Sequence, residues 1–467
     1  MNLHLVLLAT YSLVLVLVGL RIGRFVHRAG DFFVAGRRLG AGLLFSTVLA
    51  ANIGAGSTVG ATSLGYRDGL SAWWWNGSAG IGSLALALWV GPRIWREAAR
   101  HNFFTVGDFL EHRFGPSVRG VITLLIAFGA LWILAGQLIG VASILNEVAG
   151  LPRLAGAAIG GTVITVYFVA GGLLSSAWVN VIQLTVKLVG FAVAVPWVVR
   201  GAGWWSGLAS SPAAPSGYSD FWFSSGTGSG WQLIGLLAPA FVVSPGLLQK
   251  IYGARDERAV RRGIGANALA LMAFGFAPAL LGMAARAKFP ELADVNLALP
   301  TILVRALPPL VGSLALAAIF SAEISAADAV LFMLSTSLSQ DLYRRFIKPE
   351  ADERRVLLVA RCAAGVGGAL GVGLAVLLPT VVAALSVFYA LLGVSLFVPL
   401  IAGLYTERPG TQEALASIVA GMAAWLWAQF AAGGQALGPI TPNLFGILSA
   451  AAAFGIVWAV RAARTIR

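Results

Sequence analysis

Three ionisable residues stand inside long apolar stretches of the sequence. Lys187 is about a dozen residues from either end of the apolar run 176–199, and Glu323 and Asp328 lie within the run 309–337. A dozen helical residues span ~18 Å, which is farther than a lysine side chain can reach. A buried ammonium therefore needs a carboxylate partner, a water-filled cavity or a change of protonation state. Two interpretations stay open: a static salt bridge between helices, or an amine that cycles its proton.

Two other apolar runs are interrupted by residues that weaken a helix. The segment 50–60 holds three glycines among small polar side chains, and the segment 238–246 holds two prolines and a glycine. Proline removes a backbone donor, and glycine has a low helix propensity. We expect unwound segments near 53–57 and 243–246 that face each other across a binding cavity.

The elements that hold these residues are predicted to be membrane-spanning helices. Of the 467 residues, 58% are hydrophobic and 11% are charged, too few to cover a water-soluble core with polar side chains. Apolar runs of 18 or more residues recur, each able to cross a ~30 Å hydrocarbon core as a helix. The alternation over ~10 residues that is typical of an outer-membrane barrel is absent. Thirteen spans are predicted, at 3–20, 41–65, 70–91, 120–147, 154–172, 176–199, 232–250, 264–285, 309–337, 356–379, 381–403, 411–430 and 442–460.

The distribution of charge sets the expected topology. With the N-terminus outside, 25 of the 32 Lys and Arg residues fall in cytoplasmic segments or at the cytoplasmic ends of spans and six outside, while Lys187 falls in the middle of a span. Cytoplasmic loops of membrane proteins carry this excess of basic residues. The net charge of +13 is therefore expected to face anionic lipid headgroups rather than nucleic acid.

Several function classes are excluded by what the spans lack. Cys362 is the one cysteine, so neither an internal disulfide nor a cysteine metal site is possible. No cluster of metal-binding histidines and no Ser/His/Asp group stands within the spans. We expect neither an enzyme nor a cofactor.

The interrupted spans predict an inverted repeat. They are five spans apart and therefore enter the membrane from opposite sides. Paired broken helices at matching positions of two halves are typical of secondary transporters, whose binding site lies at the midplane. The expected fold is an all-α integral membrane protein of about thirteen helices, with a five-plus-five inverted-repeat core and two broken helices. Glycine in such spans also serves close helix packing, which is the alternative interpretation.

Four sequence motifs, in order along residues 30 to 405, resemble the sodium:solute symporter family, whose members share the leucine-transporter-type fold. They are Asp31–Arg37 (DFFVAGR), Thr105–Phe114 (TVGDFLEHRF), Tyr167–Gly172 (YFVAGG) with Trp178–Gln183 (WVNVIQ), and Ala317–Ser321 (AAIFS) running on to Gln340–Tyr343 (QDLY). The resemblance implies an extra N-terminal helix in 1–30, a first repeat in 31–200, a second repeat in 201–405, and two added helices in 406–467. The N-terminus would lie outside and the C-terminus inside.

The resemblance also implies a sodium ion where the first core helix breaks. Its ligands would be the backbone oxygens of Ala50, Ile53 and Ala322 and hydroxyls at the positions of Ser325 and Ala326. This sequence departs from that pattern, because Ala326 has no hydroxyl.

Two further departures lie on the helix that contains Lys187. Asn180 stands where the family usually has an aspartate lining the ion's exit, and Lys187 lies two turns further on. Lys187 then forms a static salt bridge with Asp328 or Glu323. Alternatively, its amine takes the place of sodium or carries a coupling proton. Two interpretations stay open for Glu323: it is a second proton-binding site, or it is a buried partner of the polar backbone at the helix break.

The residues expected to contact the solute are small or neutral. In sugar-carrying members, polar side chains stand at the positions of Ser57, Asn76, Ala79 and Ser244, and here Pro245 stands beside the last of these. A sugar is therefore disfavoured, while an amino acid, carboxylate, nucleobase-like or quaternary-amine solute stays open. Trp73, Trp74 and Trp75 form either an aromatic wall or part of an interfacial belt.

The predicted function is a symporter that moves a small organic solute across the cytoplasmic membrane by alternating access. The resemblance implies sodium coupling, and a sodium-independent, proton-coupled carrier that uses Lys187 is the alternative. An intramembrane solute sensor is the alternative of another class, although we expect no signalling module after the last span.

Overall fold

The computed structural model of the chain describes residues 3–23, 37–209, 214, 216–222, 230–434 and 440–466. The predicted motif segment Asp31–Gly36 lies outside the described residues. Those that are described form helices joined by turns, with one isolated pairing of extended backbone, between Leu39 and Ala254.

The first half of the chain is a series of helices with short interruptions. These are α1 (Leu3–Gly23), α3 (Ala41–Asn52), the π-helix η2 (Gly56–Gly60), α4 (Ala61–Asp68), η3 (Gly69–Ala72), α5 (Trp73–Ala85), η4 (Leu86–Val90), α6 (Gly91–His101), α7 (Val106–Phe114), α8 (Pro116–Ala149), α9 (Arg153–Gly201) and α10 (Trp204–Ala209).

The second half continues the pattern with longer helices. These are α11 (Gly230–Val243), α12 (Pro245–Tyr252), α13 (Glu257–Phe274), α14 (Phe276–Lys288), η5 (Val295–Leu297), α15 (Ala298–Arg305), α16 (Pro309–Thr336), η6 (Ser337–Ile347), α17 (Glu353–Leu377), α18 (Val381–Tyr405), α19 (Thr411–Leu426), η7 (Trp427–Ala431) and α20 (Pro442–Ile466).

The prediction of an all-helical, multi-pass membrane protein is confirmed. Within the described residues, nine helices are long and apolar enough to cross a membrane, or ten if α3 and the segment Gly56–His101, bent by 61°, form one span. Leu3–Val14 and Arg153–Val166 are shorter apolar helices. The count of thirteen spans stays a prediction.

The predicted spans 154–172 and 176–199 both fall within α9, which runs from Arg153 to Gly201. Its part Arg153–Val166 is a shorter apolar helix, and its part Val179–Gly201 is long and apolar enough to cross a membrane. The turn expected between the two spans stays a prediction.

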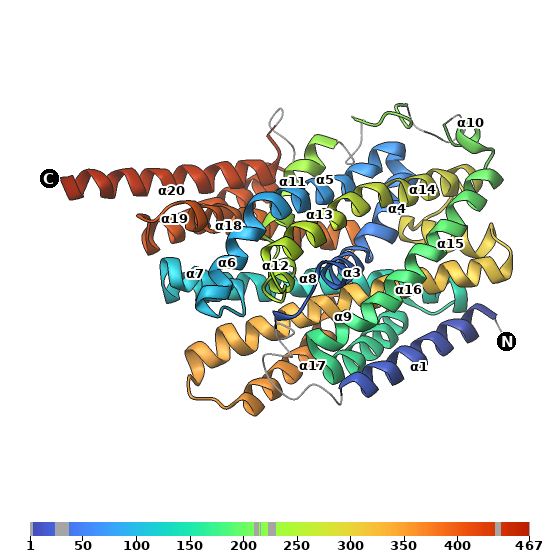
Figure 1. The fold of residues 1–467 in the computed structure, drawn as a ribbon. Coiled ribbons are helices and arrows are strands. Elements are labelled where there is room, and N and C mark those ends of the chain that lie inside the picture. Colours follow the sequence, from blue (N-terminus) through green and yellow to red (C-terminus); the bar gives the residue numbers. More distant parts are fainter. Residues whose placement is uncertain are drawn as a thin grey trace.

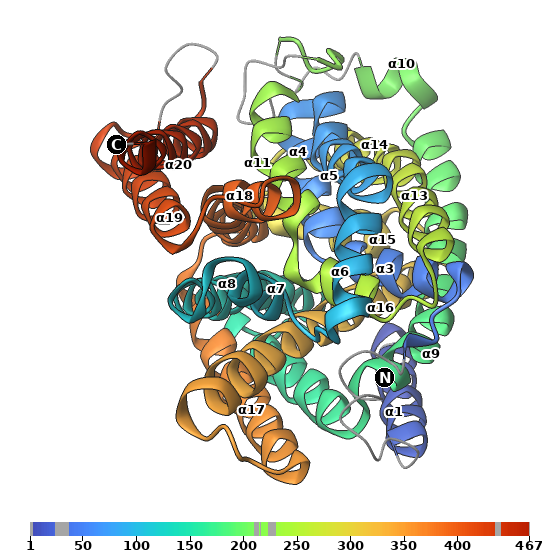
Figure 2. The ribbon, with the colours of Figure 1, turned by 60° about the vertical axis from the view of Figure 1, so that its left-hand side comes forward.

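The helices form one bundle, with the start of α1 and the end of α20 at opposite ends (Figure 1). α16 lies at the centre, buried along most of its length, and packs against α9, α8, α17 and α1. Figure 2 shows α19 and α20 as a pair at one side of the bundle, where they pack against α18. The core around α16 therefore positions the site, and α1, α19 and α20 flank it.

Ion pairs fasten one end of this core. Arg119 at the start of α8 is 2.7 Å from the carboxylates of Asp108 and Glu111 and 2.6 Å from that of Asp341. Asp108 also accepts hydrogen bonds from backbone N–H groups at the start of α7, where Thr105 forms a capping box with it. The Thr105–Phe114 motif thus ties α7 to α8 and to η6.

Candidate functional site

The first core helix is broken where the sequence predicts. α3 ends at Asn52, and Ile53 has φ −86° and ψ 84°, outside the helical region, before η2 begins at Gly56. A side chain at Gly54 would overlap the methyl carbon of Ala326 and approach Gln137 Oε1 to 2.7 Å. Only glycine therefore lets the broken segment lie this close to α16 and α8.

The second break separates α11 from α12. Ser244 is non-helical, with ψ 117°, and Pro245 begins α12. Pro239 lies inside α11. A proline at the first position of a helix costs no backbone hydrogen bond, so the chain can end one helix at Val243 and begin another two residues later.

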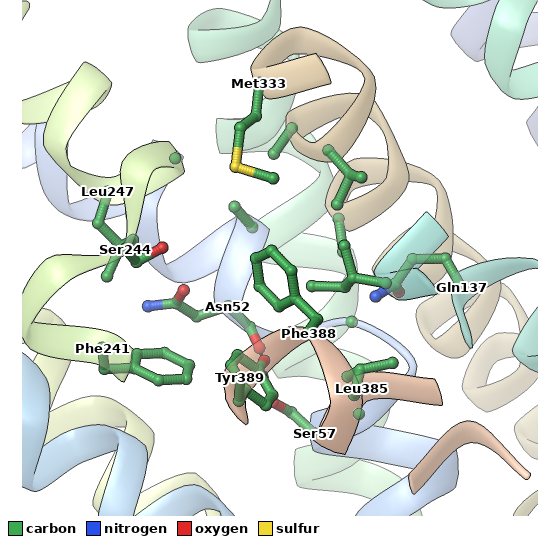
Figure 3. A pocket seen from close by; sticks show the side chains of 18 of the residues that line it. Asn52, Ser57, Gln137, Phe241, Ser244, Leu247, Met333, Leu385, Phe388 and Tyr389 are labelled. Atoms are coloured by element: carbon green, nitrogen blue, oxygen red, sulfur yellow. Dashed lines mark hydrogen bonds between the residues drawn. The ribbon is translucent and has the colours of Figure 1, made fainter. Parts of the chain in front are cut away.

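A cavity lies between the two breaks (Figure 3). Aromatic and small polar side chains surround it, with Met333 of α16 and Gln137 of α8 on further walls. Its lining is Ala51, Asn52, Gly54, Gly56, Ser57, Ile133, Gln137, Phe241, Ser244, Gly246, Leu247, Lys250, Ala326, Ala329, Val330, Met333, Leu385, Phe388 and Tyr389.

The predicted solute-contacting residues divide at this cavity. Ser57 and Ser244 line it. Asn76 does not, which corrects the prediction that it would: it is buried behind the break, and its Nδ2 donates to the backbone oxygen of Ser57 at 3.2 Å. Pro245 begins α12 without forming part of the lining. Asn76 thus supports the unwound segment from behind.

The tryptophan triplet lies away from the cavity lining as well. Trp73 and Trp74 pack against each other and against Phe221, while the Trp75 ring is 6.1 Å from that of Tyr389. Tyr389 is the ring that reaches the cavity. Trp75 therefore backs the ring of Tyr389, whereas Trp73 and Trp74 belong to a separate aromatic cluster with Phe221.

Lys187 lies at the first break. The side chain is fully buried, and Nζ donates to Ala50 O at 2.5 Å, to Ile53 O at 3.1 Å and to Ser325 Oγ. An ammonium has three N–H donors, so these three acceptors satisfy all of them. They are three of the groups that the resemblance assigns to sodium, and a fourth, Ala322 O, is 3.1 Å from Ser325 Oγ.

Residue 326 cannot supply the hydroxyl that the resemblance expects there. Ala326 of α16 is buried and faces Gly54 with its methyl carbon, so it supplies no hydroxyl. Three oxygens that the resemblance assigns to sodium thus accept hydrogen bonds from the Lys187 ammonium, and the hydroxyl expected at position 326 is missing.

A second buried lysine, which sequence reasoning missed, contacts the middle of α3. Lys250 is 3% exposed, and Nζ donates to Thr47 O at 2.8 Å. Asn180 Nδ2 donates to the hydroxyl of the same threonine at 3.0 Å. The sequence placed Lys250 at the boundary of a predicted span, where a basic residue signals only topology.

Glu323 is close enough to Lys187, and Asp328 to Lys250, for their charges to interact. The hydrogen bonds of Lys187 go to Ala50, Ile53 and Ser325, so its pairing with Asp328 stays a prediction. Asp328 lies five residues beyond Glu323 on the helix, which turns it toward α12.

Glu323 also contacts the first break. It is fully buried, and its Oε1 is 2.9 Å from the hydroxyl of Thr58, which is itself 2.9 Å from Gly54 O. Among the described residues, its Oε2 has no hydrogen-bond partner. A hydroxyl has one hydrogen to donate. If Thr58 donates to Gly54, its contact with Glu323 is a hydrogen bond only when the carboxyl carries a proton.

Known proteins are similar to this chain in sequence. The model of the sodium:solute symporter family matches residues 32–421. The chain is 30% identical over 419 residues to the sodium/pantothenate symporter of Escherichia coli, covering 84% of this chain and 82% of that protein. It is 22% identical over 403 residues to the sodium/glucose cotransporter of Vibrio parahaemolyticus, covering 76% and 71%.

Solved structures show the same fold. The outward-open state of a Na+-coupled sialic acid symporter superposes with a TM-score of 0.80 at 19% identity, covering 98% of both chains. A nucleobase-cation-symport-1 family transporter in a closed conformation superposes with a TM-score of 0.61 at 15% identity, covering 93% and 95%. These relatives are transporters and not enzymes. The chain belongs to the sodium:solute symporter family and is a secondary active symporter.

Proposed function

We propose that this symporter carries a small organic solute by alternating access and that the Lys187 ammonium takes the place of sodium at the first helix break. The observation that carries the proposal is the set of three hydrogen bonds from Nζ to Ala50 O, Ile53 O and Ser325 Oγ. The ammonium makes the contacts that the resemblance gives to the ion.

Charge repulsion supports mutual exclusion of the two cations. A sodium ion ~4 Å from the ammonium would be repelled by ~4 kcal/mol at an effective dielectric constant of ~20, roughly a thousandfold in affinity. The missing hydroxyl at Ala326 weakens the site further. Transport would therefore not require sodium at this position.

A proton is the coupling ion that the remaining groups favour. Lys187 and Glu323 can both bind and release a proton, and both touch the segment that must rearrange when the cavity changes its accessible side. The Thr58 contact suits a protonated Glu323 in the state described. Sodium coupling through this site is the alternative, which membership of the sodium:solute symporter family favours.

The organisation we propose follows the predicted domains. Residues 31–200 and 201–405 are the two inverted repeats, 1–30 is the extra N-terminal helix, and 406–467 are the two added helices, in the cytoplasmic membrane. Ser57 and Ser244 would contact the solute, with Asn76 and Pro245 holding the two breaks. Asn180 would line the ion's inward route beside Thr47. A sugar has several hydroxyl groups that each need a hydrogen-bond partner, and the cavity lining offers few polar side chains to pair with them.

The first experiment tests ion binding without a solute. The purified full chain is heated in detergent with sodium, potassium or choline chloride. We expect no sodium-specific rise in melting temperature for the unmodified protein, because a bound ligand stabilises by mass action only where it binds. The double variant Lys187→Ala, Ala326→Ser removes the ammonium and restores the hydroxyl, so it should gain a sodium-specific rise.

Ala326→Ser alone is the matched control, since it keeps Lys187 and should stay insensitive to sodium. Uptake into proteoliposomes then tests coupling, with pantothenate as first probe because relatives are named for it. An inward proton gradient should drive accumulation without sodium. Sodium-specific stabilisation of the unmodified protein, or uptake that only a sodium gradient drives, would contradict the proposal.

A further inference from the structure

The cavity between the two breaks has one charged wall. Among the described residues that line it, Lys250 of α12 is the one with a charged side chain. None of the described lining residues carries a carboxylate. The cavity is therefore positive at the end where α12 passes α3.

Lys250 has unused hydrogen-bonding capacity. Its ammonium has three N–H donors and forms one hydrogen bond with the described protein, to Thr47 O at 2.8 Å. Asp328 acts on this charge through space but does not line the cavity. A buried charge gains most from an acceptor that it can hydrogen-bond directly, and the cavity is where such an acceptor could enter.

Other polar groups on the lining add donors. Gln137 Oε1 accepts a hydrogen bond from the backbone N–H of Ala55 at 2.8 Å, so the NH₂ group of the same amide is left to donate. Figure 3 shows the amide end of Gln137 and the hydroxyl of Ser244 directed toward the cavity. These groups, like Lys250, favour a ligand rich in acceptor oxygens.

Another part of the lining is aromatic. The Tyr389 ring lies 5.4 Å from Phe241 and 5.3 Å from Phe388, measured between ring centroids. Met333 and Leu385 complete an apolar surface. A ligand that fits both parts has one anionic end and a less polar body.

We propose that the solute is an organic carboxylate whose acid group binds beside Lys250 while its body contacts Phe241, Phe388 and Tyr389. This inference rests on the proposed carrier function, since it assigns the solute of the same cavity. A carboxylate offers two oxygens to the ammonium, to the Gln137 amide and to the Ser244 hydroxyl, whereas a neutral amide or alcohol replaces an acceptor with a donor.

The charge balance of the buried core agrees with this assignment. Lys187, Lys250 and the carboxylate of Asp328 sum to +1 when Glu323 carries the proton that its contact with Thr58 suits. An anionic solute brings that sum to zero. A cationic solute would instead meet Lys250 directly.

The first test compares solutes that differ only in charge. Melting temperatures of the purified full chain are recorded against concentration for pantothenate and pantothenol, nicotinate and nicotinamide, and phenylacetate and phenylacetamide. At least one carboxylate should stabilise the protein, with an affinity about tenfold or more above that of its neutral analogue, as expected for one hydrogen bond to a charged group. Equal stabilisation by the neutral analogues, or no stabilisation by any carboxylate, would overturn the inference.

The second test removes the charge of Lys250 or keeps it on a different side chain. For the carboxylate that binds, Lys250→Gln should weaken affinity by about tenfold to a hundredfold, whereas Lys250→Arg should largely keep it. Arg255→Gln is the control, because that residue is exposed in the loop that follows α12. A Lys250→Gln protein that binds the carboxylate as tightly as the unmodified protein would contradict the assignment.

Binding and transport together separate the two proposals. A carboxylate that binds through Lys250 but is not transported would overturn its assignment as the solute and leave the proposed role of Lys187 untouched. Carboxylate uptake that Lys250→Gln weakens but that only a sodium gradient drives would contradict the proposed role of Lys187 and leave this inference standing.

Discussion

Lys187 and Lys250 are both buried in the membrane core, and both donate to backbone oxygens of the same half-helix, α3. They differ in how far those contacts satisfy them. Lys187 has three acceptors for three donors, while Lys250 has one acceptor and a place on the cavity lining. The Lys187 ammonium has all three donors paired within the protein, whereas the Lys250 ammonium can also donate to a ligand.

The difference shows that burial alone does not assign a role to a charged residue in a membrane. Both side chains avoid the cost of an unpaired charge in hydrocarbon. Lys187 does so with three acceptors from the protein, so its ammonium has no donor left for a solute. Lys250 relies on one carbonyl and the field of Asp328, so a ligand can improve its surroundings.

The largest effect is expected from Lys187→Met. The variant removes all three hydrogen bonds of the buried ammonium, and each hydrogen bond to a charged group contributes about 1.5–3 kcal/mol. Thermal unfolding should show this loss. In proteoliposomes, proton-driven accumulation should be abolished while solute exchange stays possible.

Lys187→Arg is the control that keeps the charge but does not fit three converging acceptors. It should unfold at a temperature between those of the unmodified protein and Lys187→Met. Unaltered accumulation and pH dependence in Lys187→Met would show that the lysine is only structural.

A steric change at the break should have the next largest effect. Gly54→Ala forces a methyl group against Ala326 and Gln137 Oε1, and overpacking of this kind costs about 1–3 kcal/mol. The segment that presents Ile53 O to Lys187 would shift, while the Thr47 carbonyl that Lys250 uses would not. Melting temperature measures the loss, and adding Ala326→Gly should recover part of it.

Lys250→Met should destabilise the protein less than Lys187→Met. One hydrogen bond to a carbonyl is lost, and such a bond to a charged group contributes about 1.5–3 kcal/mol. Solute affinity should fall more than stability does. A larger stability loss than in Lys187→Met, with solute affinity unchanged, would reverse the roles that we assign to the two lysines.

The smallest effect is expected from Asn180→Asp, which introduces the acid usual in the family. Asn180 is 1% exposed, so the new acid should hold a proton there, and its O–H can donate to the Thr47 hydroxyl in place of the amide N–H, which donates at 3.0 Å. Stability should change by about 1 kcal/mol or less. Sodium-dependent stabilisation should still be absent, because Lys187 remains; a sodium response would show that Asn180 decides ion choice.

Part of the site could be predicted from the sequence because its signals are local. Glycines and prolines inside apolar runs mark the breaks at 53–57 and 243–246, and distance from both ends of a span shows that Lys187 cannot reach water. Lys250 carried no such signal, because a basic residue at the end of a predicted span is what topology alone predicts. Gln137 did stand inside a predicted span, and its polarity there could have been noticed.

Residue type did not decide which polar groups reach the cavity. Asn76 and Ser57 are both small polar residues near the break, yet the amide of Asn76 donates to the backbone of Ser57 and lies behind it. The assignment of acids to lysines was likewise beyond the sequence. Asp328 and Glu323 are both within reach of α9 on a helical count, and only the packing of α16 between α9 and α12 turns one toward each lysine.

The sequence by itself determined that this chain spans a membrane as helices, that two of them are broken, and that a lysine must be buried near one break. These follow from hydropathy, from the backbone chemistry of glycine and proline, and from helix length. Only the tertiary structure decided that the ammonium fills the position expected for sodium and that a second lysine faces the solute cavity. Both depend on where side chains from four separate helices converge, and a pattern along one chain does not contain that geometry.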